Sequence, residues 1–159
     1  MQPVNLILKF DGGMDGKNPG GTPRYGWVLE ADGIEVMHGK GRGENLPASD
    51  RTNNVAEWLG LIAGLEALSV MDRGDCVIEN LKICGDSQLV LNQFAGRWKV
   101  KSPHLAKYRD MAQAAFLLIP TRFKPKVKWI PRAENTRADK LANSAKSTPS
   151  KFLELVDVE

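Results

Sequence analysis

The chain has 159 residues, of which 42% are hydrophobic and 26% are charged, and its formal net charge is +3. This length suits one domain with a sizeable core, and the composition is that of a globular protein rather than a disordered one. The sequence shows no signal-peptide pattern and no apolar run of the roughly 20 residues that span a bilayer, so we expect a cytoplasmic protein without a membrane partner.

The N-terminal part of the chain predicts three strands. Residues 4–11 are apolar enough for a buried strand, which we expect to end before a glycine-rich turn. Residues 25–31 and 34–40 are also β-like. Asp32 and Gly33, which join these two runs, form a dipeptide typical of a two-residue hairpin. We therefore expect the chain to begin as an antiparallel meander.

Helices and strands alternate in the rest of the predicted structure. The first helix is apolar on two faces, which predicts that it is largely buried. Capping residues and prolines mark the ends of the helices. In chain order the elements are a helix at 52–69, a strand within 77–85, a helix from Asp86 or Ser87 to about Ala95, a helix from Pro103 to about Leu118, a strand at 126–130 and a helix from Asn135 or Thr136 to about Lys146.

This order of elements, β-β-β-α-β-α-α-β-α, predicts an α/β fold. A meander followed by alternating helices and strands indicates a five-stranded mixed sheet whose later strands are parallel, with helices on both faces. We expect one domain over residues 1–147 and a C-terminal tail over 148–159. The apolar LELV run in this tail could dock on the domain, and a loose tail is the alternative.

Two aspartates occupy equivalent places in this predicted sheet. Asp11 falls at the end of the first strand and Asp86 at the end of the fourth. If these strands are neighbours, the two side chains meet at the carboxyl ends where ligands bind in open α/β sheets. Structural roles remain open, because Asp11 could simply form a turn and Asp86 could simply cap a helix.

Two further acids lie on predicted helices. Asp139 falls in the first turn or two of the last helix, where the helix dipole alone favours an acid. Glu57 lies in a very apolar part of the first helix, with no Lys or Arg three or four residues away. A carboxylate there loses hydration and needs a partner from elsewhere. A metal ion is one candidate.

Five segments that contain these acids resemble type 1 ribonuclease H, over about residues 4–146. A single DG or DS carries no information, but five motifs in the family's order, with all four acids on matching elements, are specific. The resemblance implies the ribonuclease H fold and an endonuclease that hydrolyses the RNA strand of RNA/DNA hybrids. The segments are FDGG at 10–13, NPGGTPRYGW at 18–27, RTNNVAEWLGLIAGLEAL at 51–68, GDSQLV at 85–90 and WIPRAENTRADKLA at 129–142.

The resemblance also implies how the four carboxylates act. Asp11, Glu57, Asp86 and Asp139 would be both the catalytic residues and the metal ligands. Hard oxygen ligands suit Mg²⁺, with Mn²⁺ as an alternative, and the implied mechanism uses two ions per site. Asp11 would bridge both ions, Asp86 would ligate near the nucleophilic water, and Asp139 would complete the second site.

Contacts to the hybrid are implied in the same way. Asn53 and Asn54 would reach into the minor groove beside Glu57, and Gln88 would contact the RNA strand near the scissile bond. Some of these residues have structural alternatives, since a Thr before a helix is a good cap and an Asn before Pro-Gly is a good turn residue. The implied substrate-binding residues are Gly12, Asn18, Thr52, Asn53, Asn54, Gln88, Trp98 and Arg132.

The chain departs from many family members in a basic region. Where those members carry a long basic protrusion, this chain passes directly from RWKVKSP at 97–103 into the next helix. We therefore expect a short form with lower affinity for the hybrid, unless Lys99, Lys101 and Lys107 compensate. Trp98 resembles the aromatic residue that packs against a DNA sugar, and a place in the core is the alternative.

A second departure concerns a loop histidine that helps proton transfer or product release in many members. The segment PRAEN at 131–135 holds no histidine, whereas His38 and His104 fall on a predicted strand and a helix start. Arg132 or Glu134 could partly substitute. Because some members with a shortened loop also cut double-stranded RNA, that activity stays open.

Three other functions compete with this hypothesis. The first is a binding module that holds nucleic acid without cutting it. The presence of all four acids argues against it, because a module that does not catalyse cleavage would not need to keep them. A nuclease acting on duplex or junction DNA would not need the Asn53–Asn54 pair beside Glu57 for ribose recognition. A nucleotide-binding phosphotransferase is disfavoured, because GMDGKNPGG lacks the GxxxxGK[ST] pattern. We expect the protein to act as a monomer.

Overall fold

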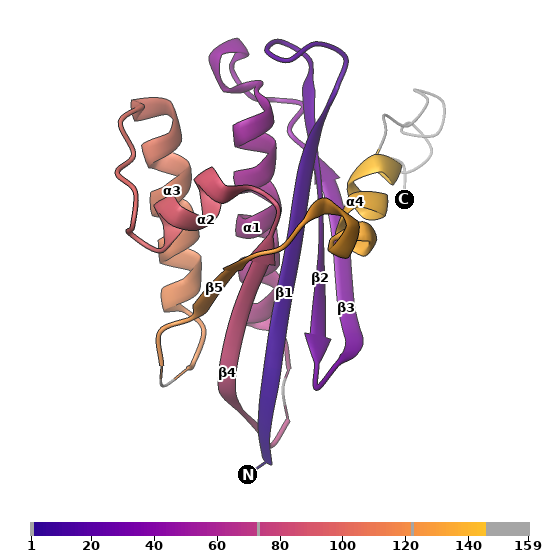
Figure 1. Cartoon of the computed structure of the whole chain (residues 1–159), viewed down its shortest axis with the longest axis vertical. Helices are drawn as coiled ribbons and strands as arrows, with labels where there is room; N and C mark the ends of the chain where they lie inside the picture. Colours follow the sequence, from indigo (N-terminus) through magenta and orange to yellow (C-terminus); the bar gives the residue numbers. More distant parts are fainter. Residues whose placement is uncertain (1, 73, 122, 146–159) are drawn as a thin grey trace, which may run out of the picture.

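The computed structural model describes residues 2–72, 74–121 and 123–145. Over these residues five strands and four α-helices follow one another in the order predicted from the sequence (Figure 1). Two short 3-10 helices, η1 and η2, lie in the loops. The strands are β1 (Gln2–Asp15), β2 (Thr22–Ala31), β3 (Ile34–Arg42), β4 (Cys76–Gly85) and β5 (Lys126–Trp129), and the helices are η1 (Ala48–Asp50), α1 (Asn53–Val70), α2 (Gln88–Phe94), α3 (Pro103–Leu117), η2 (Arg132–Glu134) and α4 (Thr136–Ser144).

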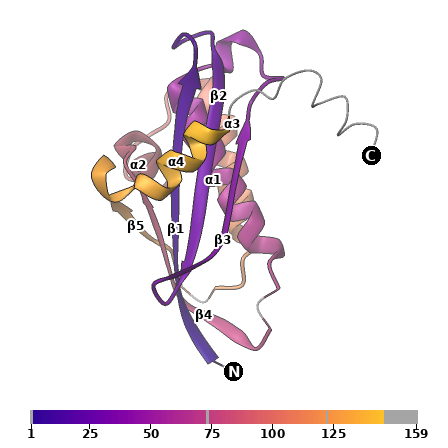
Figure 2. The same ribbon diagram turned by 90° about the vertical axis from the view of Figure 1, so that its right-hand side faces the viewer.

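The sheet is mixed, as predicted. Its strand order is β3-β2-β1-β4-β5. β1 pairs antiparallel with β2 and parallel with β4, while β5 pairs parallel with β4. α1 packs on β1 and β2, with α3 outside it, and α4 packs against β1, β2 and β3 from the opposite face (Figures 1 and 2). The predicted layers, with helices on both faces, are confirmed.

The hydrophobic core fills the space between α1 and the sheet. Alternate residues of β1 point toward α1, and α1 itself is apolar on two faces because α3 covers its outer side. The side chains that are completely or almost completely buried include Leu6, Leu8 and Phe10 of β1 and Trp58, Leu61, Leu65 and Leu68 of α1.

β1 is longer than the sequence predicts, and the expected turn after Asp11 is wrong. The strand continues through Gly12 and Gly13 to Asp15, so Asp11 lies inside it. Gly12 and Gly13 continue the pairing with β2, opposite Tyr25 and Arg24. A Cβ on Gly12 would lie 2.3 Å from the backbone carbonyl carbon of Ala56, so α1 approaches the strand closely at this point. Glycine is thus required by packing, not by a turn.

A second glycine admits α4 from the other face. A Cβ on Gly26, which pairs with Asp11 across the β1–β2 ladder, would lie 2.6 Å from the Cβ of Leu141. The two helices therefore approach the sheet closely on opposite faces at the level of Asp11. The second turn of α1 carries Glu57 and the first turn of α4 carries Asp139, the other predicted acids.

Some expectations fall outside the described residues. These are the end of the last helix near Lys146 and the tail at 148–159. No helix among the described residues is long and apolar enough to cross a membrane.

Candidate active site

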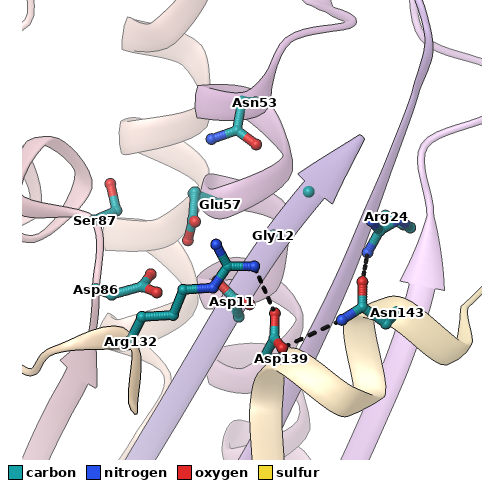
Figure 3. A pocket seen from close by; sticks show the side chains of 11 residues that line it. Asp11, Gly12, Arg24, Asn53, Glu57, Asp86, Ser87, Arg132, Asp139 and Asn143 are labelled. Carbon is teal, nitrogen blue, oxygen red and sulfur yellow. Dashed lines mark hydrogen bonds and ion pairs between the residues drawn. The ribbon is translucent and has the colours of Figure 1, made fainter. Parts of the chain in front are cut away.

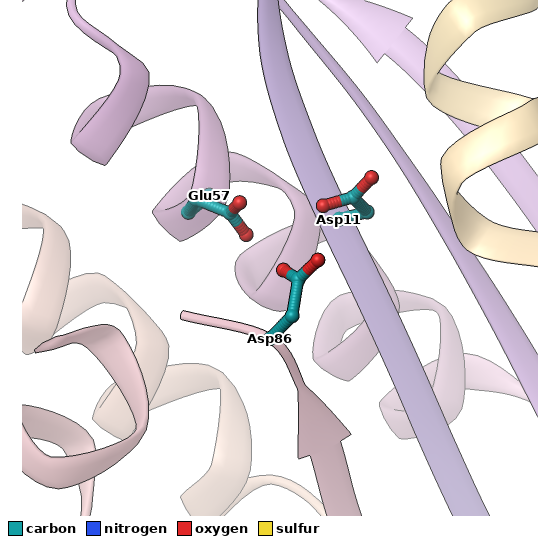
Figure 4. A group of neighbouring side chains, drawn as sticks. All are labelled: Asp11, Glu57 and Asp86. Atoms are coloured by element: carbon teal, nitrogen blue, oxygen red, sulfur yellow. The ribbon is translucent and has the colours of Figure 1, made fainter. Parts of the chain in front are cut away.

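Three acidic side chains converge at the carboxyl end of β4. Asp11 comes from the middle of the sheet, Glu57 from the second turn of α1, and Asp86 from the residue after β4 (Figure 4). One oxygen of each carboxylate lies within 4.8 Å of the other two. β1 and β4 are neighbours in the sheet, which is the arrangement that the sequence required for Asp11 and Asp86 to meet.

Asp139 reaches the same place from α4. It lies on the wall of a hollow of about 350 Å³ that the three other acids also line (Figure 3). Asp139 is also close enough to Asp11 to contribute to the raised pKa of that carboxyl. All four predicted acids therefore share one hollow, which is lined by Asp11, Gly12, Gly13, Arg24, Asn53, Glu57, Asp86, Ser87, Arg132, Asp139 and Asn143.

Burial and mutual repulsion disfavour the charged forms of two of these carboxylates. Burial, followed by the charge of Asp86 and then the contacts with Asp139, raises the pKa of Asp11 to about 8. Burial, followed by the charges of Asp11 and Asp86, raises the pKa of Glu57 well above its ordinary value. The Gly12 backbone N–H opposes both rises in pKa. At about 4 Å and an effective dielectric near 20, each pair of like charges costs on the order of 4 kcal/mol.

This cluster fits a hard divalent cation. All of its donors are carboxylate oxygens, the ligands that Mg²⁺ and Mn²⁺ prefer. Glu57 Oε2 is buried and has no hydrogen-bond partner among the described residues, so one strong acceptor points into the site unsatisfied. The only ion pair that the described residues make with these four acids is the 3.7 Å contact between Arg132 Nη2 and Asp139 Oδ1. A bound cation would compensate the negative charge of these carboxylates, which the side chains of the protein leave largely unpaired.

The simple structural roles considered for two of the acids do not apply. Ser87, not Asp86, caps α2, because its hydroxyl accepts a hydrogen bond from the Val90 N–H (3.2 Å). Asp11 lies inside β1 and forms no turn. Asp139 does lie in the first turn of α4, where the helix dipole favours its negative charge. It lines the acidic hollow as well.

The residues that hold Asp139 in place were not predicted from the sequence. The Asn143 amide donates from Nδ2 to Asp139 Oδ2 (3.2 Å) and accepts from Arg24 Nη1 at Oδ1 (2.7 Å) (Figure 3). Arg24 is anchored in turn by Asp15 Oδ1, 3.0 Å from its Nε. The one available signal was the i, i+4 spacing of Asp139 and Asn143 on a predicted helix.

The predicted substrate-binding residues divide into two groups. Gly12, Asn53 and Arg132 line the hollow. Asn18 and Thr52 do not line it and instead cap α1: the Asn18 side chain accepts from the Asn53 N–H (3.1 Å), and the Thr52 hydroxyl accepts from the Val55 N–H (3.2 Å). The structural alternative considered for Thr52, a helix cap, is thus observed, and Asn18 supports the same helix start. Contact of either residue with a substrate stays a prediction.

The remaining predicted contacts lie outside the hollow. Asn54 and Gln88 are exposed near the starts of α1 and α2. Trp98 is 46% exposed, so its placement in the core is wrong. Lys107 forms an ion pair with the fully buried Asp50. Its charge therefore compensates a buried acid.

The two histidines lie away from the acids, as predicted. His38 contacts Glu35 Oε2 at 3.1 Å and His104 contacts Asp50 Oδ1 at 3.3 Å. Neither lines the hollow. Of the two substitutes considered for the missing loop histidine, Arg132 lines the hollow and Glu134 does not.

Comparison with known proteins gives a consistent family. A family model described as reverse transcriptase-like matches residues 10–145. The chain is 39% identical over 144 residues to the bifunctional protein Rv2228c of Mycobacterium tuberculosis, covering 89% of this chain and 35% of that protein. It is 39% identical over 138 residues to the ribonuclease HI of Halobacterium salinarum, covering 86% of this chain and 61% of that protein. The chain thus spans only part of the length of these relatives.

Solved structures support the same fold. The N-terminal RNase H domain of Rv2228c, solved as a fusion with maltose-binding protein, superposes with a TM-score of 0.72 at 37% identity, covering 89% of this chain and 93% of that one. LC11-RNase H1 in complex with an RNA/DNA hybrid superposes with a TM-score of 0.74 at 30% identity, covering 88% of this chain and 95% of that one. The predicted fold class is confirmed.

The raised pKa of Asp11 predicts how stability depends on pH without divalent cations. Its pKa is about 8 in the folded protein and about 4 in an unfolded chain. The folded state therefore holds the proton more tightly, and ionisation between these values destabilises the fold. We expect Asp11→Asn to raise the melting temperature in EDTA at pH 8 by at least about 2 °C, since about 1 kcal/mol corresponds to about 2–4 °C in a domain of this size. The gain should shrink toward pH 4.

Asp15→Asn is the matched control. Arg42 lowers the pKa of Asp15 through a hydrogen bond, so its charge stabilises the fold and its removal should lower the melting temperature at pH 8. Adding Mg²⁺ should raise the melting temperature of the unmodified protein more than that of Asp11→Asn. An Asp11→Asn protein that melts below the unmodified protein in EDTA at pH 8 would contradict this account of the site.

Proposed function

The chain belongs to the reverse transcriptase-like family and is a homologue of the ribonucleases H, and we propose that it is an endonuclease that hydrolyses the RNA strand of RNA/DNA hybrids. The observation that carries this proposal is the convergence of Asp11, Glu57 and Asp86 within 4.8 Å, with Asp139 on the same hollow. The complex of LC11-RNase H1 with an RNA/DNA hybrid supports the choice of substrate.

We propose that the four carboxylates hold two divalent cations, Mg²⁺ or Mn²⁺. When bound, the cations would supply an activated water and neutralise the charge that develops on the leaving oxygen. Asp11 is near Glu57, Asp86 and Asp139, so its carboxylate could serve both cations. Glu57 and Asp86 would hold a cation from the side of α1 and β4, and Asp139 would hold one from the side of α4.

The first turn of α1 is placed to recognise ribose. Asn53 precedes Glu57 by four residues, so both side chains lie on the same face of α1 and both line the hollow. Asn18 holds the start of this helix through the Asn53 N–H. An amide and a carboxylate side by side can pair with a 2′-hydroxyl, which is both donor and acceptor and distinguishes RNA from DNA.

Arg132 takes the place of a loop histidine in the proposed reaction. It lies on η2, its side chain is 79% exposed, and its guanidinium reaches toward Asp139. An exposed guanidinium beside the hollow can compensate negative charge on the phosphate of the departing product. The short connection between β5 and α4 also leaves the hollow open, so we include weaker cleavage of double-stranded RNA among the proposed activities.

Asp86→Asn tests the central proposal. Removing one charge while keeping the shape should abolish cleavage, since the site then lacks one ligand and one charge near the nucleophile, but should leave hybrid binding nearly unchanged. End-labelled hybrid, double-stranded RNA, single strands and duplex DNA would be incubated with the unmodified protein and the variant, with Mg²⁺ or Mn²⁺. Binding without cleavage by the unmodified protein would instead indicate a binding module, and full activity of the variant would refute the assignment.

Asn143→Ala tests how Asp139 is held. Loss of residues that orient metal ligands typically costs about 10–100-fold in metal affinity or activity. We expect kcat to fall in that range, KM for the hybrid to stay constant and the Mg²⁺ concentration for half-maximal activity to rise. Asn80→Ala is the control, because the Asn80 amide donates to Asn5 Oδ1 (2.8 Å) at the opposite end of the sheet. Equal effects of both substitutions would indicate a general loss of folding.

Arg132→Ala tests the substitute for the histidine. Because the Arg132 side chain is 79% exposed and its ion pair with Asp139 is long, at 3.7 Å, the stability of the protein should change little. Multiple-turnover kcat should fall by about tenfold or more. The upper limit is the contribution typical of general acid–base catalysis, about 10²–10⁴-fold. Glu134→Ala, on the same 3-10 helix but off the hollow, should retain its turnover. Unchanged turnover of Arg132→Ala would remove Arg132 from the mechanism.

A further inference from the structure

A basic hollow lies on the face of the sheet that α4 covers only in part. It measures about 390 Å³ and is lined by Ile7, Lys9, Lys82, Cys84, Lys128, Ile130 and Glu134. α4 packs on β1, β2 and β3, whereas α2 contacts β4 and β5 from the core side. The β4–β5 half of this face is therefore open among the described residues.

The strand register gathers the lysines. Lys9, Cys84 and Lys128 occupy one rung of the sheet, and Lys82 pairs with Lys126 on the next. Adjacent strands lie about 4.8 Å apart and residues on one face of a strand recur every 6.6 Å or so, which makes these side chains neighbours. Burial raises the pKa of the Cys84 thiol, and the ammonium groups of Lys82, Lys9 and Lys128 each oppose that rise. Their charges thus converge on one point.

Most of this positive charge is not compensated by the protein. Glu30 pairs with Lys9 at 3.1 Å. No acidic side chain among the described residues forms an ion pair with Lys82, Lys126 or Lys128, which together we name the lysine face. Glu134, the one acidic residue that lines the hollow, is exposed.

The lysine face does not serve the fold. Like charges on facing positions of neighbouring strands disfavour strand pairing, and Lys82 faces Lys126. Lysines on an edge strand can prevent association between sheets, which would account for Lys126 and Lys128 on β5. Lys82 lies on β4, an interior strand, and protection of the edge leaves it unexplained.

The basic hollow adjoins the acidic hollow. Lys9 and Asp11 are two residues apart on the same side of β1, about 6.6 Å along the strand. The segment from β5 to α4 passes across β1 (Figure 1) and contributes to both hollows, since Glu134 lines the basic one. Its backbone is held by Ile130 N–H to Gly85 O (2.9 Å) and by Asn135 Nδ2 to Phe10 O (2.8 Å). Arg132 on this segment lines the acidic hollow. A strand that leaves the acids past Arg132 therefore meets the lysines next.

We propose that the lysine face binds the phosphate backbone of a single-stranded nucleic-acid segment that continues from the duplex held at the acidic hollow. The proposal rests on the proposed function for the position of that duplex. The segment from β5 to α4 contributes to both hollows, so a flexible strand can follow it from one to the other whereas a stiff duplex cannot. No aromatic side chain of the described residues lines the basic hollow, so binding is to phosphates, independent of base sequence and dependent on salt.

The test compares blunt hybrids with hybrids that carry a single-stranded RNA or DNA overhang of about ten nucleotides. Binding would be measured by fluorescence anisotropy over a range of salt concentrations, with Asp86→Asn in every protein to prevent cleavage. We expect an overhang to increase affinity. Adding Lys82→Gln and Lys128→Gln should abolish that increase and make the salt slope for the overhang substrate shallower by about 1.4, or about 0.7 for each phosphate that a lysine no longer neutralises. Affinity for the blunt hybrid should not change.

The control removes the same charge elsewhere. Lys40, whose ammonium donates to Ser144 Oγ (3.0 Å), and Lys140, exposed on α4, lie off the lysine face. Lys40→Gln with Lys140→Gln should keep the increase in affinity. An increase that persists without Lys82 and Lys128, or no increase with any overhang, overturns the proposal. Lysine-dependent binding to phosphatidylserine vesicles without an effect of overhangs would also overturn it in favour of a membrane surface.

A footprint on the unsubstituted lysines covers the case of a variant that does not fold. Acetylation followed by mass spectrometry should show Lys82, Lys126 and Lys128 protected by an overhang hybrid but not by a blunt one, with Lys40 and Lys140 equally reactive in both. The proposed function is tested separately by cleavage of the blunt hybrid. If the blunt hybrid is not cleaved but the overhang still protects the lysines, the proposed ribonuclease activity is wrong and the proposed binding at the lysine face is supported.

Discussion

Repulsion between buried carboxylates is the constraint on which the rest of the structure depends. Asp11, Glu57 and Asp86 lie within 4.8 Å of one another, and burial together with neighbouring charge raises the pKa of Asp11 and of Glu57. Such an arrangement persists only if the surrounding structure is stiff enough to resist it. The stiffness comes from β1, which pairs on both sides, and from α1, whose backbone touches that strand at Gly12. The stability given up at this site is recovered in the core between these two elements.

The sequence predicted the order of the elements well because periodicity and punctuation act locally. The hairpin at Asp32 and Gly33 formed as expected, with both residues at positive φ (49° and 84°). The extent of β1 was not predictable in the same way. Gly12 and Gly13 resemble a turn in the sequence, but both pair with β2, and the helix that packs on Gly12 leaves room only for a glycine there. Packing between segments more than forty residues apart leaves no local signal.

The site divides along the same line. The acids were visible because each falls at the end or start of a predicted element, where topology brings such positions together. Asn143 and Arg24 could not be predicted in this way. They hold Asp139 through hydrogen bonds that join α4 to β2, and these contacts exist only in the folded protein. Lys107 shows the opposite error. A lysine in a basic stretch suggests contact with phosphates, but its charge is used inside the fold by the buried Asp50.

One face of β1 contributes to both the acidic hollow and the basic hollow, and strand geometry explains why they can coexist. Lys9 and Asp11 project from the same side, so opposite charges stand about 6.6 Å apart along the strand, yet they form no ion pair: Lys9 pairs with Glu30 across the sheet instead. Glu30 therefore keeps the ammonium group of Lys9 from the aspartate. Were Glu30 absent, the lysine would be free to neutralise the aspartate, lower its pKa and compete with a cation for its oxygens. The pairing of Lys9 with Glu30 thus leaves the charge of Asp11 uncompensated, as the proposed binding of a cation requires.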